Sequence, residues 1–347
     1  MTHPPIKNRI LVVGAGFSGA TVARRLAEEG LSIVVIDKRN HVAGNAYDYT
    51  HELGIRVHKY GPHIFHTNNE QVYLWLQKFT EWIPYKHKVK AMLQDGTLVT
   101  MPPNKLTADI VGRENIADIL FKPYTQKMWG LTVDEIDAGV LARVKIRDDE
   151  NELYFPKDKY QAMPKHGYTK LIKNILDHEN IELRLNQPFT KDMEDKYEKV
   201  FNSMPIDEYY NYRFGELPYR SIKFTHQEIN APRLLPVPTV NFTNNGPYTR
   251  MTEWKGYPEH GTNNLRTLLT FEEPCDYKQN NMERFYPVKD KLGINATLYK
   301  KYKSIKNNKV EFIGRCGMYV YIDMHQAVSS SLAIAERFLT CLNNADK

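Results

Sequence analysis

The chain has 347 residues, more than a single hydrophobic core usually organises, so two or more domains are expected. With 41% hydrophobic residues it has the composition of an ordinary globular protein, and no apolar run approaches the ~18–20 residues of a membrane span. Its 47 Lys and Arg residues alternate with 41 Asp and Glu residues instead of forming basic runs, which argues against a nucleic-acid-binding protein.

The chain begins with a complete βαβ pattern. An apolar strand, Ile10 to Val13, leads into a glycine-rich turn, a helix and a second apolar strand that ends at Asp37. In Gly14-x-Gly16-x-x-Gly19 the glycines allow a tight bend, close approach of a pyrophosphate, and packing of the helix on the strand. The helix N-terminus offers free N–H groups to a diphosphate, and Asp37 is placed to accept hydrogen bonds from ribose hydroxyls. These features predict a dinucleotide site.

The later elements are predicted from periodicity and turn residues. A helix is expected at Asn69 to Phe79, a hairpin at 88–101 around Asp95-Gly96, and helical structure over 106–138. Residues 141–165 carry charges and aromatic rings without a clear period, which indicates a mobile functional loop. Further along, the pattern predicts a helix at Tyr168 to His178, strands at 181–185, 199–203 and 310–314, antiparallel sheet within 220–290, and a closing helix at Gln326 to Leu342.

We expect an α/β fold of three parts. A discontinuous Rossmann-like dinucleotide-binding domain opens the chain, is revisited in the middle and closes it, and it is joined by a small helical domain and an antiparallel β-sheet domain. The expected boundaries are 1–87, 186–218 and 305–347 for the dinucleotide-binding domain, 103–140 for the helical domain with its mobile loop 141–165, and 88–102 with 219–304 for the sheet domain.

Several segments outside the βαβ pattern are long and unusual in composition. After Gly44-Asn45 come HKYGPHIFHT (58–67), YTQKMWG (124–130), MPKHGYTKLI (163–172), GPYTR (246–250), FYPV (285–288), and Gly314-Arg315 with YVYIDMHQ (319–326). In this order, and over nearly the whole chain, these segments resemble the UDP-galactopyranose mutase family.

The resemblance implies an isomerase that interconverts the pyranose and furanose forms of a nucleotide-linked sugar without net redox change. Its dinucleotide would be FAD, active when reduced, with flavin N5 as the nucleophile at the anomeric carbon. UDP-galactose is the expected substrate, and another nucleotide sugar such as dTDP-fucose is the alternative. The family also implies a homodimer with a role in polysaccharide biosynthesis. The three scattered cysteines are expected to be reduced thiols, which indicates a cytoplasmic protein.

The matching motifs carry over the residues of the family's flavin site. Arg315 and Asp323 belong to a second flavin segment, where a helix N-terminus would again face the cofactor. Asp323 can equally be an ordinary helix N-cap. The expected cofactor-binding residues are Gly14, Gly16, Ser18, Gly19, Asp37, Lys38, Gly44, Asn45, His63, Ile64, Arg315, Tyr321, Asp323 and Met324.

Two arginines are expected to grip the substrate's diphosphate, since a guanidinium can give two N–H bonds to phosphate oxygens. Arg143 and Arg250 match family arginines, and with His63, which the family places against the flavin, they are the expected catalytic residues. Arg147 has no family match and is expected to be a surface charge. The expected substrate-binding residues are His87, Phe121, Tyr124, Thr125, Trp129, Arg143, Tyr154, Asn241, Arg250, Tyr286 and Tyr321.

Other interpretations stay open. His63 and His66 can be read as metal ligands, but no third ligand has a helpful spacing. A core histidine with a satisfied hydrogen bond is the alternative for His63 and the favoured interpretation for His66. Cys275, Cys316 and Cys341 lack the spacing of a zinc site or a disulfide framework, so no metal is expected. An amine-oxidase-type flavin oxidoreductase shares the FAD fold, and a catalytically silent nucleotide-sugar binding protein would also retain FAD.

Some positions depart from the family pattern. The segment between Pro103 and Tyr124 is shorter than in the bacterial mutases, so a more open pocket is expected. Ala43 replaces the first glycine of a Gly-Gly pair, and Trp254 stands where a histidine usually follows the arginine of PYTR. His87 takes the place of an asparagine. These changes bear on sugar and base preference and leave the flavin chemistry intact.

Overall fold

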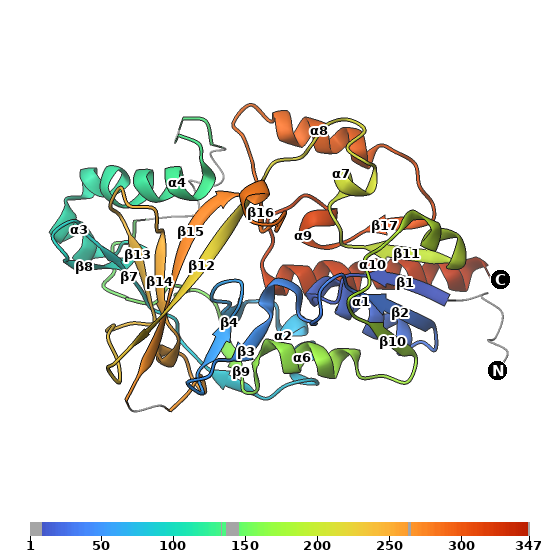
Figure 1. Ribbon diagram of the computed structural model, residues 1–347, viewed down its shortest axis with the longest axis horizontal. Helices are drawn as coiled ribbons and strands as arrows, with labels where there is room; N and C mark the ends of the chain where they lie inside the picture. The colour runs from blue at the N-terminus through green and yellow to red at the C-terminus, as the bar shows by residue number, and fades with distance from the viewer. Residues whose placement is uncertain (1–8, 133, 137–145, 263–264, 346–347) are drawn as a thin grey trace.

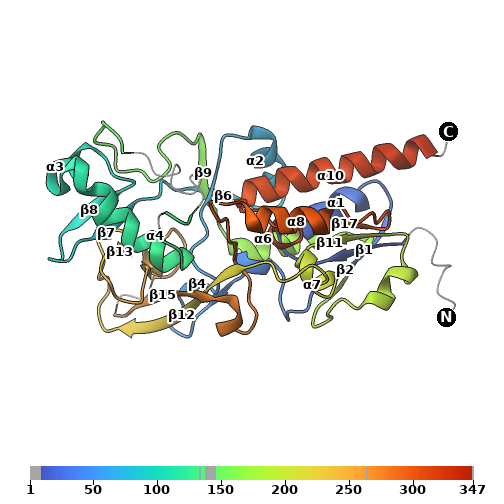
Figure 2. The same ribbon diagram turned by 90° about the horizontal axis from the view of Figure 1, so that it is seen from above.

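The computed structural model describes residues 9–132, 134–136, 146–262 and 265–345 (Figure 1). Its two larger sheets, one of five strands and one of seven, lie toward opposite ends of the long axis (Figures 1 and 2). Two smaller sheets, of two and three strands, lie between them. The expected α/β class is confirmed.

The five-stranded sheet is parallel throughout. In spatial order its strands are β10 (Ile181–Arg184), β2 (Ser32–Ile36), β1 (Arg9–Val13), β11 (Lys199–Asn202) and β17 (Val310–Phe312). The chain builds first to one side of β1 and later to the other, so the strand order reverses between β1 and β11. In open α/β sheets, ligands bind at such a switch point, beyond the carboxyl ends of the strands. Because β10 pairs with β2, the sheet includes residues before the expected boundary at 186.

Alternate residues of the central strands face two hydrophobic cores. Ile10 and Val12 belong to one core and Leu11 and Val13 to the other, so both faces of the sheet are buried, as parallel sheets require. The first core is covered by four helices, α1 (Phe17–Ala27), α2 (Glu70–Gln77), α6 (Gly167–Leu176) and α10 (Met324–Ala345).

The seven-stranded sheet combines two distant parts of the chain. Its strands, in spatial order, are β16 (Tyr286–Pro287), β12 (Tyr219–Ile229), β15 (Thr267–Asp276), β14 (Arg250–Glu253), β13 (Thr239–Phe242), β7 (Val89–Met92) and β8 (Leu98–Met101). The expected hairpin is β7–β8. It joins the other strands through a parallel pairing with β13, so the sheet is antiparallel except at that one pair of strands.

The helical segment after the hairpin is broken into short pieces. Helix α3 (Lys105–Val111) begins after Asn104, whose side chain accepts a hydrogen bond from the N–H of Thr107 over 3.0 Å. The turns η2 (Arg113–Asn115) and η3 (Ala117–Phe121) lead to α4 (Lys122–Trp129), which ends at Gly130 in the left-handed conformation. Residues 133 and 137–138 of the expected helical segment lie outside the described residues.

One expectation about an irregular region is wrong. Within the expected mobile loop 141–165, Tyr160–Pro164 form strand β9, which pairs with β5 (Phe65–Thr67) and β6 (Trp82–Pro84). Within the expected sheet domain, Ile294–Lys303 form helix α8. The remaining short elements are β3 (Asp48–Thr50), β4 (Arg56–His58), α7 (Ile206–Tyr209), α9 (Gly314–Gly317), η1 (Gly44–Ala46), η4 (Lys191–Lys196), η5 (Trp254–Gly256) and η6 (Tyr277–Gln279). Across the described ranges, no helix combines the length and apolar character needed to cross a bilayer.

Backbone packing at the glycine-rich turn leaves no room for side chains. A Cβ on Gly19 would lie 1.8 Å from the carbonyl oxygen of Gly14, and a Cβ on Gly14 would lie 2.0 Å from Oγ of Ser203, just after β11. The glycines therefore let α1 pack on β1 and let the chain after β1 and after β11 run side by side.

Replacing Gly19 by alanine should lower the free energy of unfolding by about 3 kcal/mol, because the added methyl overlaps a backbone carbonyl and the helix must shift. Gly30→Ala is the matched control. It adds the same methyl at a φ of +83° with no atom within 4 Å, and should cost only about 1 kcal/mol. Urea unfolding followed by circular dichroism measures both, and equal losses would contradict the packing role of Gly19.

Candidate active site

A cavity of about 310 Å³ lies at the switch point of the parallel sheet. Of the expected cofactor-binding residues, Ile64 and Tyr321 line a neighbouring cavity instead. The others all line this one: Gly14, Gly16, Ser18, Gly19, Asp37, Lys38, Gly44, Asn45, His63, Arg315, Asp323 and Met324. Residues that are far apart in the sequence thus meet where the fold predicts a ligand.

Two backbone N–H groups fix the side chain of Asp37. The N–H of Ala15 donates to its Oδ2 over 2.8 Å, and the N–H of Arg39 donates to its Oδ1 over 2.9 Å. These bonds hold the carboxylate at the cavity wall. Each carboxylate oxygen keeps a second lone pair for a ligand hydroxyl, so the expected role in ribose binding remains possible in this geometry.

Part of the cavity wall was missed by the sequence analysis. Arg39 forms an ion pair with Glu283 and donates to Oδ1 of Asn45 over 3.0 Å. Arg284, which is 4% exposed, donates to Oε2 of Glu208 over 2.7 Å. The signal in the sequence for Arg39 is its position two residues after Asp37. Residues 282–284 come from a distant loop, and no local pattern marks them.

A second cavity, of about 180 Å³, lies beside the first. The two cavities share four lining residues, namely His63, Arg315, Asp323 and Met324. Further walls of the second cavity come from the turn 60–64, from strands β13, β14 and β15, and from the rings of Tyr154, Tyr286 and Tyr321. Ligands in the two cavities would therefore meet at the four shared residues.

His63 is held firmly at this junction. Gly61, with φ +88°, bends the chain so that Nδ1 of His63 donates to the Gly61 carbonyl over 2.8 Å. Burial lowers the pKa of His63 to about 4, so its ring is neutral near pH 7. His66 is directed elsewhere, because its Nδ1 lies 2.6 Å from Oδ2 of Asp158, although the residue also lines the second cavity.

Three polar side chains form a row across the seven-stranded sheet. Strand register places Asn241 of β13 opposite Arg250 of β14, and Arg250 opposite Glu272 of β15, so all three side chains share one face. Arg250 Nε lies 3.7 Å from Oε2 of Glu272. Three buried atoms of this row have no hydrogen-bond partner: Oδ1 of Asn241, Nε of Arg250 and Oε1 of Glu272. Since buried polar atoms are normally paired, they indicate a place for a polar ligand.

The row places a fixed positive charge beside a deeply buried carboxyl group. The Glu272 side chain is 2% exposed and that of Arg250 is 26% exposed. Burial raises the pKa of Glu272, and Arg250 offsets this only in part. Burial alone would lower the pKa of Arg250, but Glu272 and the hydroxyls of Tyr124 and Tyr286 raise it well above its ordinary value. The guanidinium therefore stays charged.

Helix α4 is tied to this sheet by two cations. Lys127 Nζ donates to the backbone carbonyls of Phe242, Asn244 and Tyr248, and burial lowers its pKa to about 8. Arg220 of β12 donates to the carbonyl of Met128 over 2.9 Å at the end of the helix. These contacts fix how α4 faces the site.

The expected substrate residues on this helical segment are close to the second cavity but do not line it. Tyr124 contacts a residue that lines the cavity, because its hydroxyl accepts a hydrogen bond from Arg250 Nη2 over 3.2 Å. Trp129 lies edge-on to Tyr286 and Tyr321, with ring centroids 6.3 and 6.5 Å away. Thr125 is buried, and Phe121 packs against the core beside the hairpin.

His87 and Tyr154 both line the second cavity. They are neighbours, because the N–H of Tyr154 donates to the carbonyl of His87 over 2.8 Å. Burial lowers the pKa of His87 to about 3 and raises that of Tyr154 to about 12. Near pH 7 the imidazole is neutral and the phenol keeps its proton, so the phenol can donate a hydrogen bond to a ligand.

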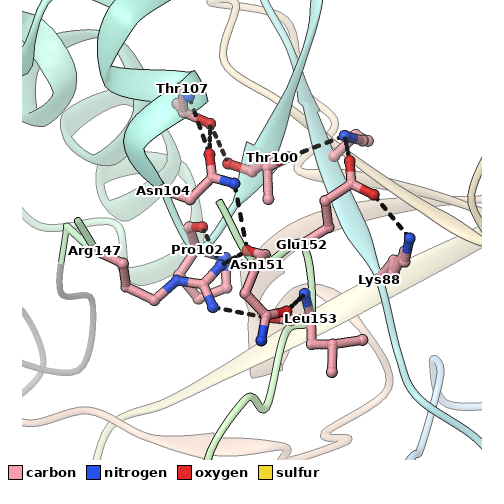
Figure 3. Close-up of polar contacts among 10 residues, drawn as sticks. Lys88, Thr100, Pro102, Asn104, Thr107, Arg147, Asn151, Glu152 and Leu153 are labelled. Carbon is pink, nitrogen blue, oxygen red and sulfur yellow. Dashed lines mark hydrogen bonds and ion pairs between the residues drawn. The ribbon is translucent and has the colours of Figure 1, made fainter. Parts of the chain in front are cut away.

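The expectation that Arg147 is a surface charge is wrong. Its side chain is 12% exposed and donates to three backbone carbonyls, those of Pro102, Asn151 and Leu153 (Figure 3). A solvated arginine would make no such set of contacts. Arg147 therefore anchors the segment that leads directly to Tyr154.

A second group of contacts reinforces this anchor. Glu152 pairs with Lys88 over 2.7 Å (Figure 3). It also pairs with Lys90 of β7 over 2.5 Å. Side-chain hydrogen bonds to Glu152 from these lysines lower its pKa to about 2. Arg143, the other expected diphosphate ligand, lies outside the described residues.

The chain is similar to known proteins in family, in sequence and in fold. Residues 119–321 match the family model for UDP-galactopyranose mutase, and residues 12–79 match that for an NAD(P)-binding Rossmann-like domain. The chain belongs to the UDP-galactopyranose mutase family. This confirms the resemblance seen in the sequence and makes the protein an isomerase.

The similarity to individual relatives and solved structures covers nearly the whole chain. The chain is 33% identical to the probable UDP-galactopyranose mutase of Klebsiella pneumoniae, over 97% of this chain and 96% of that protein. It is 32% identical to the dTDP-fucopyranose mutase of Escherichia coli, over 96% and 98%. Its fold is similar to a crystal structure of reduced UDP-galactopyranose mutase, with a TM-score of 0.76, 16% identity and coverage of 98% and 95%.

One departure from the mutase family pattern has a clear structural cost. Ala43 has φ +72°, in the left-handed region that favours glycine, and is 1% exposed beside the first cavity. The glycine expected there would adopt this conformation freely. In this mutase the turn is kept with alanine at a cost of about 1 kcal/mol.

Buried neutral histidines should make the stability of this mutase depend on pH. The folded-state pKa values of His63 and His87, about 4 and 3, lie below the ordinary value of 6.5, so the unfolded chain takes up protons first as the pH falls. The stability contributed by the neutral form is therefore fully present above about pH 7 and is lost progressively as the pH falls below 6.5.

We expect the free energy of unfolding to fall between pH 7.5 and pH 5.0, by at most about 2 kcal/mol for each such histidine. His87→Gln should reduce the difference in proton uptake between the unfolded and folded states by about one proton, and so flatten this pH dependence. Urea titrations at a series of pH values measure the slope. An unchanged slope in His87→Gln would show that this ring is not the titrating group.

Proposed function

We propose that this mutase interconverts the pyranose and furanose forms of a nucleotide-diphosphate sugar, with FAD in the first cavity and the sugar nucleotide in the second. UDP-galactose is the proposed substrate, and dTDP-fucose is the alternative, since one similar relative is named dTDP-fucopyranose mutase. The observation that carries the proposal is the meeting of the two cavities at His63, next to the row of Asn241, Arg250 and Glu272 with its unpaired polar atoms.

The residues of the first cavity fit FAD. The absence of a Cβ at the glycine turn lets a diphosphate approach the backbone at the start of α1, and Asp37 is oriented for a ribose. The fold of a reduced UDP-galactopyranose mutase and that of a putrescine oxidase are both similar to this chain, which supports a flavin. Reduced FAD, when bound, supplies the nucleophilic nitrogen N5, and the reaction needs no net electron transfer.

The protein's own residues bind and stabilise the nucleotide. Arg250 carries a permanent positive charge, which stabilises the diphosphate as it gains negative charge on leaving the sugar. The hydroxyl of Tyr124 orients the guanidinium, and Tyr154 keeps its proton and can donate to a phosphate oxygen. Arg143, which lies outside the described residues, is assigned the same charge-stabilising role because it matches a family arginine. Glu272 and Asn241 have acceptor oxygens free for sugar hydroxyls.

The function is tested by incubating purified protein with UDP-galactofuranose or dTDP-fucofuranose, with and without dithionite, and following the sugar nucleotides by chromatography. Conversion to the pyranose only after reduction is the expected result, with the larger kcat/KM identifying the preferred substrate. Bleaching of the flavin by substrate together with an oxidised sugar would instead support an oxidoreductase. Binding without any conversion would leave only the silent binding protein.

Replacing Arg250 by lysine should lower kcat by on the order of 100-fold, because lysine keeps the charge but cannot give two aligned hydrogen bonds. Arg250→Ala should lose more, because Glu272 is then left as an unpaired buried carboxyl. The flavin absorption spectrum should be unchanged in both. Arg337→Ala, on the outer face of α10, is the control and should retain full turnover. Normal kcat in Arg250→Lys would refute the diphosphate role.

A further inference from the structure

A chain of hydrogen bonds through two buried histidine rings ends at the junction of the cavities. The backbone N–H of His63 donates to Nδ1 of His58 over 3.0 Å. Nε2 of His58 lies 3.1 Å from Nε2 of His260, and Nδ1 of His260 lies 2.7 Å from the carbonyl oxygen of Pro258. His58 and His260 are 1% and 2% exposed, and neither lines either of the two cavities described above.

The end partners determine where each ring carries its proton. A peptide N–H can only donate, so Nδ1 of His58 is the bare nitrogen and its proton is on Nε2. A carbonyl can only accept, so His260 carries its proton on Nδ1 and its Nε2 accepts from His58. The three hydrogen bonds therefore run in one donor-to-acceptor direction, from the N–H of His63 through both rings to the carbonyl of Pro258. A second proton on either ring would place two donors face to face.

The surroundings favour the neutral forms and restrain the rings. Trp254 and Tyr168 pack against His58, with ring centroids 5.1 and 5.5 Å away. Burial lowers the pKa of His58 well below its ordinary value and lowers that of His260 to about 4. The titratable or charged groups that face the pair from the neighbouring elements are Arg56, His63, Tyr168 and Tyr257. The positive charge of Arg56 also disfavours protonation of both rings.

The two histidines come from separate parts of the fold. His58 ends β4, whereas His260 follows η5 in the connection between β14 and β15 of the seven-stranded sheet. The N–H of Arg56 also donates to the carbonyl of His260 over 2.7 Å, so backbone and side chains both join these segments. The connection is thus a fixed support behind the turn 60–64.

We propose that His58 and His260 are positioning residues that hold the His63 peptide in place at the junction of the cavities. The inference rests on the proposed function, in which the flavin ring of FAD lies beside this turn. The two rings contact no ligand and act only through the N–H of His63. With the acceptor at His58 present, that N–H points away from the cavities. Without it, the N–H is a buried unpaired donor, and the turn must shift to satisfy it.

Substitution by asparagine or glutamine can test the roles of the two ring nitrogens, Nδ1 and Nε2, separately. Asparagine at position 58 keeps an acceptor near the place of Nδ1, whereas glutamine reaches the place of Nε2 and removes the acceptor for His63. At position 260, glutamine keeps an acceptor for His58, whereas phenylalanine keeps the ring volume and removes it. His58→Asn and His260→Gln are therefore the conservative controls for His58→Gln and His260→Phe.

With the FAD-loaded protein we expect His58→Gln and His260→Phe to shift the flavin absorption spectrum and to lower kcat by on the order of 10- to 100-fold, with KM changed less than about twofold. His58→Asn and His260→Gln should stay close to wild type in both measurements. Melting temperatures of all four variants provide the structural control. The proposal is overturned if spectra and kcat are unchanged in the disruptive pair, or if losses in all four variants simply follow melting temperature.

A direct test of the hydrogen-bond chain uses ¹⁵N-labelled histidine and NMR. The expected spectrum places the proton of His58 on Nε2 and that of His260 on Nδ1, with both rings neutral at pH 6; the reverse tautomers would overturn the proposal. The flavin spectrum and the tautomers do not require turnover. A protein that binds FAD but converts no nucleotide sugar would therefore refute the proposed function, while these measurements still decide the positioning role.

Discussion

The site depends on the placement of one tight turn, residues 60–64, between the two larger sheets. Gly61 adopts φ +88°, and a Cβ there would lie 3.2 Å from the ring of Phe224 on β12, so the chain can bend at this point only with glycine. The bend brings His63 into the walls of both cavities. Because the parallel sheet supplies one cavity and the seven-stranded sheet the other, any shift of the turn would separate the two ligands.

The polar row of the second cavity shows that this fold is not optimised for stability alone. Burying Glu272 beside Arg250 at 3.7 Å, with unpaired atoms on both, costs desolvation free energy that the pair recovers only in part. Apolar residues on the same strands would pack without that cost. Sites that bind charged ligands often retain such strain, because the ligand supplies the missing partners when it binds.

The parts predicted well from the sequence are those whose physical cause is local. The glycine turn, its helix and Asp37 follow from backbone sterics and short-range periodicity, and the family motifs around His63, Arg250 and Asp323 are contiguous in the chain. Twelve of the expected cofactor residues line one cavity for this reason. By contrast, Phe121 and Thr125 were placed by motif alone. The motif locates them in the helical segment, Phe121 at the end of η3 and Thr125 in α4, and only the packed structure shows that neither lines the second cavity.

The contacts that the sequence did not reveal join residues far apart along the chain. Arg147 on three carbonyls, Arg39 with Glu283, and His58 with His260 each depend on how separate segments approach one another. An isolated arginine or histidine has no period or spacing from which such a partner can be inferred. The sequence by itself determined the dinucleotide fold, the family and the chemical types at the site. Only the tertiary structure decided which side chains share a cavity and which ring carries which proton, because burial and hydrogen-bond direction exist only once distant segments pack together.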